Sequence, residues 1–346
     1  MSDGVMKNIV ILATGGTIAG AGVQGKDIGY KSGSIEAQTL IDAIPELKDV
    51  ANIFVEQVCN INSDDITSEI WISLARRIKE LAVNGIGTSH ERVDGFVVMH
   101  GTDTMEETAF FLSLTLGAVD NVEGQILAKP VVLTGSMRPA TAAEPDGPAN
   151  LLFAVKSAAS SWSNAIGSTA VYVAFAGKLM DARSVQKVHA NELDAFAEVP
   201  GSAFSQTPAF DISNLHDLPR VSVLYFNVDA DAELVRFAAE RSAGLVIAGA
   251  GAGEFSLSWT TAIAKVVDEA KVPVVVSTRI NRGCIVPEQL LVPGTIAAYS
   301  LPPAKAAVLL RLALTVTNDP VKIQKMFETL LTSSSSKPVT LESEAR

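Results

Sequence analysis

The 346-residue sequence is poor in cysteine: Cys59 and Cys284 are the only two, and they lie far apart in the chain. Neither belongs to a Cys-x-x-Cys pair, which argues against a thiolate metal site or a dithiol redox motif. A single long-range disulfide stays open as an alternative. We expect two free thiols in a reducing compartment instead.

Long apolar runs are also missing. No stretch approaches the roughly 18–20 residues that a membrane-spanning helix needs. The run Ile9–Ala13 is too short for the core of a signal peptide and is more typical of a strand. We therefore expect a soluble cytoplasmic protein with no membrane partner. A periplasmic or secreted location stays open if a signal peptide was removed.

Positive charge is in short supply. The chain has 27 lysines and arginines against 38 acidic residues, a net charge of −11. An acidic surface argues against nucleic acid or an anionic membrane as the main partner. The composition, 48% apolar and 19% charged, is that of a globular protein, and the length predicts one large or two medium domains.

Short apolar runs rich in valine and isoleucine recur along the chain and lack apolar/polar alternation. Runs of this kind, separated by helical segments, indicate a parallel sheet covered on both faces and hence an α/β fold. The runs are Ile9–Ala13, Phe96–Met99, Val131–Leu133, Val171–Phe175, Val221–Phe226, Leu245–Ala248 and Val272–Val276.

Two helices can be placed in the first half of the chain. One covers Glu69–Leu81. The other begins at Met105, where Thr102, Asp103 or Thr104 can cap it, and where Glu106 and Glu107 complement the helix dipole.

Prolines punctuate the middle of the chain and predict a domain boundary. Pro200, Pro208 and Pro219 occur in a stretch of weak apolar periodicity, which is typical of a linker. We expect a larger N-terminal domain over 1–199 with a mostly parallel sheet flanked by helices. It is followed by a linker over 200–220, a smaller C-terminal α/β domain over 221–332 and a disordered tail over 333–346.

Three of the predicted strands end in similar loops: Thr14-Gly15-Gly16-Thr17, His100-Gly101-Thr102-Asp103 and Thr134-Gly135-Ser136-Met137. In a parallel α/β sheet, ligands bind beyond the carboxyl ends of the strands. Glycines there let a ligand approach main-chain N–H groups, which can stabilise an oxyanion. Each loop alone is typical of a structural turn; the three together favour a site.

Other chemistries fit the sequence less well. The segment Gly15–Gly20 is not Gly-x-Gly-x-x-Gly, Gly177-Lys178 does not continue as a phosphate loop, and Ser136 is not in a Gly-x-Ser-x-Gly elbow. The four histidines are scattered without metal-ligand spacing. We predict no cofactor and no metal. A hydroxyl nucleophile would then need a lysine base held by a carboxylate such as Asp103, and spacing leaves the lysine open.

The segment Ala13–Gly20 resembles the first signature of the bacterial-type L-asparaginases, and His100–Ala109 resembles the second. Gly135–Pro139 and Asp146–Asn150 are similar to the segment that follows, and the likeness extends to Leu309–Thr315. It is closest to the type II branch. The resemblance implies an amidohydrolase that releases L-aspartate and ammonia from L-asparagine, and a homotetramer built as a dimer of dimers with sites at the dimer interface.

The resemblance also implies catalytic roles. Thr17 is similar to the family's nucleophile, and Tyr30 to the loop tyrosine that assists it. Thr102, Asp103 and Lys187 resemble the second threonine–lysine–aspartate set, with Lys187 placed by Arg183-Ser184-Val185-Gln186-Lys187.

Substrate contacts follow from the same resemblance. Ser63 would bind the α-carboxylate, and Asp64 and Asp103 the α-ammonium. Backbone N–H groups near Gly16 and Thr102 would hold the oxyanion. The family usually has Gln or Glu where Asp64 stands, so the pocket geometry can differ. A role for Asp64 as a helix cap before Ile66 stays open, alone or together with substrate binding.

The sequence departs from the family in its C-terminal part. The loop Gly249–Glu254 lacks the asparagine that a neighbouring subunit contributes, and Glu254 or Glu288 could replace the neighbour's acidic residue. The preference for asparagine over glutamine is therefore open. Two alternatives to an L-asparaginase are a glutaminase-asparaginase of broad amide specificity and a non-catalytic amino-acid sensor with the same fold.

Overall fold

The structure is a computed structural model that describes residues 6–26, 31, 33–116, 129–160, 171–199 and 209–329. These residues divide into two compact units. One contains the described residues up to Glu198 together with Asp211–Ser213, and the other contains most of the chain from Asn214 onward. The predicted tail over 333–346 and residues 200–208 of the predicted linker lie outside the described residues.

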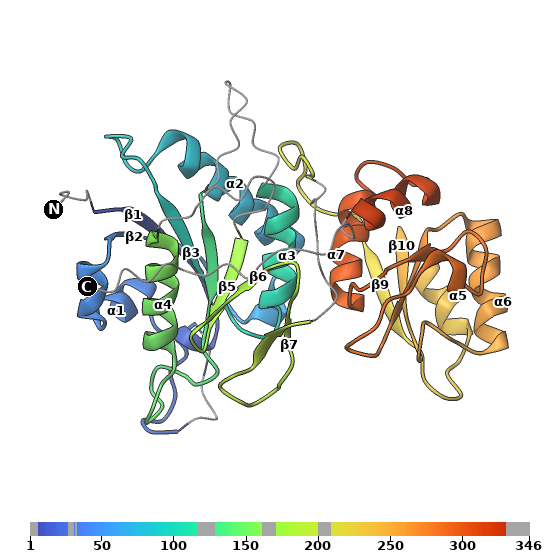
Figure 1. Cartoon of the computed structure of the whole chain (residues 1–346), viewed down its shortest axis with the longest axis horizontal. Helices are drawn as coiled ribbons and strands as arrows, with labels where there is room; N and C mark the ends of the chain where they lie inside the picture. The colour runs from blue at the N-terminus through green and yellow to red at the C-terminus, as the bar shows by residue number, and fades with distance from the viewer. Residues whose placement is uncertain are drawn as a thin grey trace. The chain divides into compact units, whose positions relative to one another are not determined.

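The N-terminal unit is built on a six-stranded sheet of order β2-β1-β3-β4-β5-β6 (Figure 1). All neighbouring strands are parallel except the last pair. The bounds are β1 Asn8–Gly15, β2 Asn52–Ile61, β3 Gly95–Met99, β4 Val131–Thr134, β5 Val171–Phe175 and β6 Lys178–Asp181. A separate antiparallel pair joins β7 (Val185–Lys187) to β8 (Phe196–Glu198).

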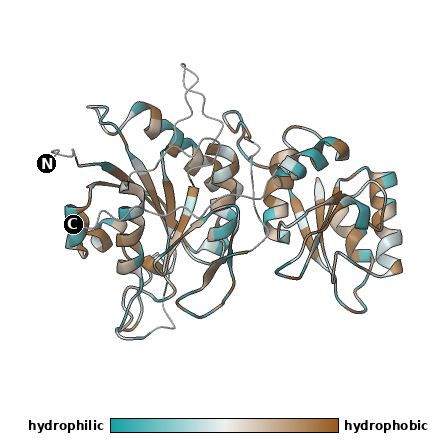
Figure 2. Ribbon diagram, in the orientation of Figure 1, coloured by the Kyte–Doolittle hydropathy of each residue, from teal (hydrophilic) through white to brown (hydrophobic). Residues whose placement is uncertain are grey.

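Helices cover both faces of this sheet, because its inner strands are buried along their whole length. On one face, Ile9 and Ile11 of β1 form a core with α1 (Ala37–Asp42) and α4 (Gly147–Ala159). The helices α2 (Ser68–Asn84) and α3 (Met105–Thr115) contact each other, with Trp71 stacked on Phe111. Figure 2 shows the apolar residues concentrated on the strands.

The C-terminal unit is a smaller parallel sheet of order β12-β11-β10-β9 with its own core. Its strands are β9 Val221–Tyr225, β10 Gly244–Gly249, β11 Val274–Thr278 and β12 Ile296–Ala297, and its helices are α5 Glu233–Ala239, α6 Leu257–Lys265, α7 Pro303–Ala313 and α8 Pro320–Thr329. The predicted α/β fold, with a larger and a smaller unit, is confirmed.

The predicted strands and both predicted helices are present, with ends shifted by a few residues. The side-chain cap expected for α3 is absent. Thr104 is the N-cap residue, but its hydroxyl donates to the Ser63 carbonyl at 2.7 Å instead of bonding the helix. Within the predicted linker, Asp211–Ser213 belongs to the N-terminal unit, and the Arg76 guanidinium donates to the carbonyls of Ile212 and Ser213.

Candidate active site

The three strand-end loops identified in the sequence lie at one edge of the N-terminal sheet. They follow β1, β3 and β4, and β3 is the parallel neighbour of both other strands. Parallel neighbours end at the same edge, so Thr14–Thr17, His100–Asp103 and Gly135–Met137 share it. The spatial clustering that the sequence pattern predicts is therefore present.

The loops after β1 and β3 meet at two glycines. A Cβ atom added to Gly16 would lie 2.5 Å from both the Cα and the N of Gly101. A Cβ atom added to Gly101 would lie 2.8 Å from the Ser63 hydroxyl oxygen. Such spacing leaves no room for a side chain at either position. The glycines thus let the segments of Thr17, Thr102 and Ser63 approach one another at backbone distance.

The two threonines of the first loop have different surroundings. Thr14 is buried, and its hydroxyl donates to the Met99 carbonyl at 3.0 Å. Thr17 is half-buried and begins a short 3-10 turn that ends at Ala19. The Thr14 hydroxyl is thus held within the sheet, whereas the Thr17 side chain is partly exposed at the end of β1.

Lys187 joins the second loop at its side-chain amine. The Lys187 Nζ lies 2.9 Å from the Thr102 Oγ1 and 2.6 Å from an Asp103 carboxylate oxygen. The Lys187 side chain is only 15% exposed, whereas that of Asp103 is 70% exposed. The Lys187 amine is thus within hydrogen-bond reach of both other side chains predicted from the sequence, which is the geometry needed for proton exchange between the Thr102 hydroxyl and the amine.

His100 lies inside the structure rather than in the site. It is fully buried, and one ring nitrogen lies 2.7 Å from the Gly101 carbonyl oxygen while the other lies 2.9 Å from the Thr108 hydroxyl. The Trp71 indole N–H donates to the same hydroxyl at 2.8 Å. Burial lowers the pKa of His100 to about 4, so the ring stays neutral near pH 7.

The two substrate-binding candidates of the next segment differ in exposure. Ser63 is buried and its carbonyl accepts the Thr104 hydroxyl, whereas Asp64 is exposed. Asp64 does not cap the following helix: Thr67 does, accepting the Ile70 N–H at 3.4 Å. The capping alternative for Asp64 is wrong, and its carboxylate is open to solvent.

Two further predictions concern the assisting tyrosine and the oxyanion donors. Tyr30, the predicted assisting tyrosine, lies outside the described residues. The N–H of Gly16 donates to the Ile61 carbonyl at 3.0 Å, so this particular amide is engaged within the fold. An oxyanion donor from this loop would therefore be another amide near Gly16.

The third loop is held by the motif Asp146–Asn150. The Asp146 carboxylate accepts the N–H groups of Met137 and Arg138, both at 2.9 Å. The buried Asn150 side chain donates to the Gly135 carbonyl and accepts the Ala176 N–H. These bonds fix the loop rather than supply a reactive group.

The C-terminal residues that depart from the family pattern belong to the C-terminal unit. The loop Gly249–Glu254 closes on itself through the Ala250 N–H, which donates to the Glu254 carbonyl at 2.8 Å. Glu254 and Glu288 are both exposed. Which of them substitutes for the family's acidic residue stays a prediction.

Sequence reasoning missed two residues that shape the site. The Thr104 hydroxyl holds the Ser63 carbonyl, and Glu106 accepts the backbone N–H of Lys187 at 2.5 Å. Glu106 is 81 positions from Lys187, so its first-turn position was its only local signal. That position predicted a favourable interaction of Glu106 with the helix dipole, but it gave no sign of the hydrogen bond to Lys187.

The described residues contain no group of three or more His, Cys, Asp or Glu side chains placed to hold a metal ion. Among the same residues, no helix combines the length and apolarity required to span a membrane. Cys59 and Cys284 are free thiols, and burial raises the pKa of both.

Comparison with known proteins gives matches along nearly the whole chain. Residues 8–213 match the family model "Asparaginase, N-terminal", and residues 220–327 match "Glutaminase/Asparaginase C-terminal domain". L-asparaginase 2 of Bacillus subtilis (strain 168) is 40% identical over 93% of this chain and 86% of its own length. L-asparaginase 2 of Escherichia coli (strain K12) is 36% identical over 93% of both chains.

The fold has a solved counterpart as well. The crystal structure of a probable cytoplasmic L-asparaginase from Campylobacter jejuni matches with a TM-score of 0.80 and 37% identity, over 93% of this chain and 99% of that one. Further relatives, 33% and 35% identical, are named glutaminase-asparaginases.

Proposed function

Because the chain belongs to the asparaginase family, we propose that it hydrolyses the side-chain amide of L-asparagine to L-aspartate and ammonia. The observation that carries the proposal is the cluster of Lys187, Thr102 and Asp103 beside the contact of Gly16 with Gly101. This cluster brings the Lys187 amine and the Asp103 carboxylate next to the loops that carry Thr17 and Thr102. No cofactor takes part in the proposed reaction.

The proposed reaction has two halves. The Thr17 hydroxyl attacks the side-chain carbonyl carbon, its proton passes to the departing nitrogen, and the carbon–nitrogen bond breaks to leave an ester on Thr17. Water then attacks that ester, gives a proton back to the Thr17 oxygen and releases L-aspartate. Tyr30 assists the first hydroxyl, and Lys187 exchanges protons with Thr102 at their 2.9 Å contact.

Substrate binding uses the charges at the rim of the site. The Ser63 hydroxyl binds the α-carboxylate, and the carboxylates of Asp64 and Asp103 bind the α-ammonium. Support comes from the exposure of both aspartates and from the closeness of Ser63 to Gly101. Backbone N–H groups near Gly16 and at Thr102 hold the oxyanion.

Two variants test the assigned roles by ammonia release from L-asparagine. Thr17→Ala removes the nucleophile and Lys187→Met removes the amine, so each is expected to lower kcat by about 10³-fold or more while the fold is kept. Lys178→Met is the matched control, because Lys178 is an exposed lysine paired with Asp194. Full turnover by either site variant would refute its assigned role.

The first alternative is a glutaminase-asparaginase, which the names of some relatives favour. Parallel measurement of kcat/KM on asparagine and glutamine separates the two proposals. Activity on glutamine above that on asparagine would overturn the first choice.

The second alternative is an amino-acid sensor with the same fold. It would bind asparagine in a calorimeter without releasing ammonia. The presence of Thr17, Thr102, Asp103 and Lys187 together argues against it.

Two further expectations belong to the proposal. We place the protein in the cytoplasm, which fits its two free thiols. Release of the protein by osmotic shock would contradict this.

We also propose a homotetramer, a dimer of dimers. Exposed apolar side chains of the C-terminal unit, such as Tyr225, Val228 and Leu257, are compatible with association, and sedimentation velocity would measure it.

A further inference from the structure

Glu106 makes a contact that the proposed mechanism does not use. It is the second residue of α3, and its carboxylate accepts the backbone N–H of Lys187 at 2.5 Å. Glu106 is half-buried and reaches across to a strand that follows it by 81 positions. A carboxylate that accepts a backbone N–H makes a charge-assisted hydrogen bond, which is stronger than a neutral one.

The contact ties Lys187 to the element that carries the partners of its amine. Thr102 and Asp103 immediately precede α3, and both bind the Lys187 Nζ. Lys187 is therefore held at two points by one segment: by Glu106 at its backbone and by Thr102 and Asp103 at its side chain. The strand β7 lies beside α3 in the fold (Figure 1).

The strand that carries Lys187 needs such an anchor. β7 has three residues, and within the described part of the chain it pairs only with β8, in a two-stranded sheet outside the six-stranded one. A two-stranded hairpin is at best marginally stable by itself. The carboxylate of Glu106 is in turn favoured where it stands, in the first turn of a helix, by the helix dipole.

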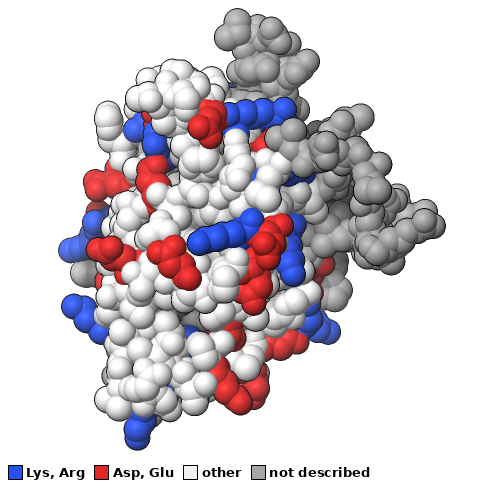
Figure 3. Space-filling view, turned by 90° about the vertical axis from the view of Figure 1, so that its left-hand side faces the viewer, with Lys and Arg blue, Asp and Glu red and all other residues white. Residues whose placement is uncertain are grey.

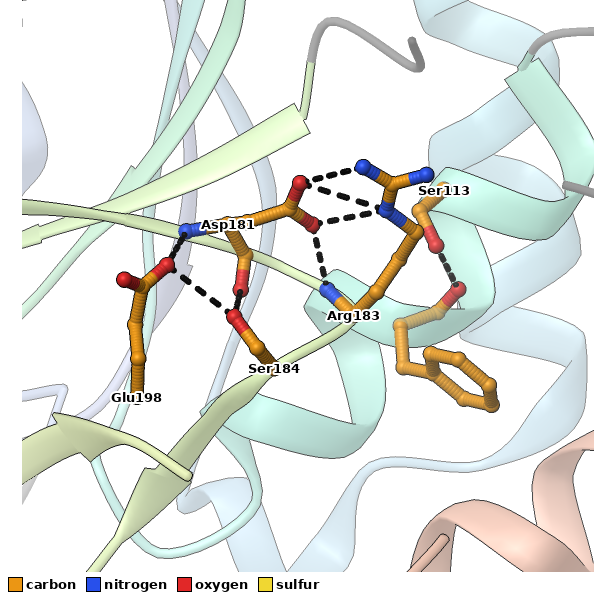
Figure 4. Close-up of polar contacts among 6 residues, drawn as sticks. Ser113, Asp181, Arg183, Ser184 and Glu198 are labelled. Atoms are coloured by element: carbon orange, nitrogen blue, oxygen red, sulfur yellow. Dashed lines mark hydrogen bonds and ion pairs between the residues drawn. The ribbon is translucent and has the colours of Figure 1, made fainter. Parts of the chain in front are cut away.

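The other end of β7 has its own fixation. Figure 4 shows Glu198 of β8 bound to the Asp181 N–H and to the Ser184 hydroxyl, at 2.8 and 3.0 Å. Those contacts fix the turn before β7, and the nearest of them, at Ser184, is three residues from Lys187. Glu106 instead binds the backbone N–H of Lys187 itself, on a residue that also pairs with Phe196 of β8.

We propose that Glu106 is a positioning residue for the reaction, which holds the backbone of Lys187 so that its amine stays in register with Thr102 and Asp103. The inference rests on the proposed function, since Lys187 is there the proton-exchanging amine. Glu106 acts through Lys187 and touches no reacting atom. Because a misplacement of about 1 Å can cost about 10²-fold in rate, loss of this bond is expected to lower turnover.

Four variants separate the hydrogen bond from the charge. Glu106→Ala removes the acceptor, and Glu106→Asp keeps the charge at the helix start but withdraws the oxygens by one methylene. Glu106→Gln loses the charge but keeps an oxygen at the same reach. Glu107→Ala is the control, because Glu107 is the next first-turn carboxylate of the same helix.

The kinetic prediction is a split between kcat and KM. We expect Ala and Asp at position 106 to lower kcat by about 10- to 100-fold without raising KM, and to shift the pH profile of kcat. We expect Glu106→Gln and Glu107→Ala to stay within about threefold of the wild type with an unshifted profile. Should Glu106→Ala not fold, the Asp and Gln variants still decide. Wild-type kcat in Glu106→Asp, or an equal loss in Glu106→Gln or Glu107→Ala, overturns the proposal.

A second readout does not depend on the reaction. Acetic anhydride labels lysine amines, and peptide mass spectrometry gives the rate at Lys187, whose side chain is 15% exposed. We expect faster labelling in Glu106→Asp than in the wild type and in Glu106→Gln. Unchanged labelling overturns the anchoring role. A wild type that releases no ammonia from asparagine refutes the proposed function alone, because the labelling test stands without it.

Discussion

Gly16 sets the spacing between the loop after β1 and the loop after β3. Its backbone has φ +83°, and a methyl group there would meet the backbone of Gly101 at 2.5 Å. A side chain at position 16 would therefore destabilise the fold in two ways: the positive φ is unfavourable for any residue with a Cβ, and the Cβ would collide with Gly101. Backbone atoms cannot rotate aside as a flexible side chain can, so the loops would have to separate.

The first prediction compares two glycines. Gly177 has a similar φ of +74° but no atom within 4 Å of an added Cβ. Gly177→Ala is expected to cost about 1–2 kcal/mol of unfolding free energy and no activity. Gly16→Ala is expected to cost more and to lower kcat by about 10²-fold, because it displaces Thr17 from Thr102. Denaturant unfolding and ammonia release check both, and equal effects of the two variants would contradict the collision.

The second prediction concerns the pH dependence set by His100. Its pKa falls from 6.5 to about 4 on folding because of burial. Between these values the unfolded chain binds a proton that the folded chain does not, so stability falls as pH drops from 6.5 towards 4. From pH 7 to pH 5 the loss from this residue is about 2 kcal/mol.

His100→Asn removes the titration while keeping an N–H donor for the Gly101 carbonyl. We expect the variant to be less stable at pH 7, because the contact with Thr108 is lost. Its further loss between pH 7 and pH 5 should be about 2 kcal/mol smaller than that of the wild type. Guanidinium unfolding at the two pH values, at matched protein concentration, measures this. If the variant lost as much stability as the wild type between pH 7 and pH 5, His100 would not be the source of the pH dependence.

At the level of elements, the turn between β6 and β7 is held by a nearly buried ion pair. The Arg183 guanidinium binds the Asp181 carboxylate at 2.6 Å, with the side chains 9% and 23% exposed. Figure 4 shows this pair beside the bonds of Glu198. Removing one partner of such a pair leaves a charge in a poorly hydrated place.

The third prediction follows from this difference in burial. Arg183→Met is expected to cost roughly 3 kcal/mol of unfolding free energy. Lys178→Met, which breaks a pair with side chains 51% and 58% exposed, is expected to cost less than about 1 kcal/mol. Urea unfolding of both variants tests the contrast. The prediction is wrong if Lys178→Met lowers the free energy of unfolding as much as Arg183→Met does.

Most of the strands predicted from the sequence are buried on both sides; the exception is β9, a partly exposed edge strand that was found because Val221–Phe226 is a largely apolar run. β3, β4 and β5 are continuous apolar runs, which is what a strand between two helix layers requires. β2 was missed because it is an edge strand: Asn52, Glu56 and Gln57 interrupt its apolar residues. Strands of two to four residues, such as β6, β7 and β12, are too short to show a period.

The site was predictable where motifs carry it. The resemblance placed Thr102, Asp103 and Lys187 together, and the described side chains meet. It gave no hint of Thr104 or Glu106, which act by binding backbone groups of Ser63 and Lys187. A backbone N–H or carbonyl belongs to every residue, so the sequence carries no mark of which one a distant side chain will bind.

At the scale of the whole molecule, the net charge of −11 does not form a single field on the face shown in Figure 3. Acidic and basic side chains are interspersed there over the coloured residues. Interspersed charges cancel beyond a Debye length of about 8 Å at physiological salt. On this face, the charge therefore provides no long-range attraction of a substrate.

The two units have separate cores, which makes their autonomy testable. In the C-terminal unit, Trp259 is buried against Phe226 and its indole N–H donates to the Ala230 carbonyl. The helices α5 and α6 cover the Leu245 and Ile247 side of the sheet, and α7 packs on Gly244 through Leu310. A parallel sheet with its own helices and core, in a fragment of about 130 residues, is within the usual size of an independent domain.

The last prediction is that residues 214–346 fold alone. Trp259 is the only tryptophan in this fragment, so its emission reports this core without interference. We expect blue-shifted emission in buffer and one cooperative red shift in urea, coincident with loss of far-UV circular dichroism. Trp259→Phe in the same fragment should remove the emission but keep the circular dichroism transition. Red-shifted emission in buffer, or a gradual change without a transition, would mean that this core forms only with the rest of the chain.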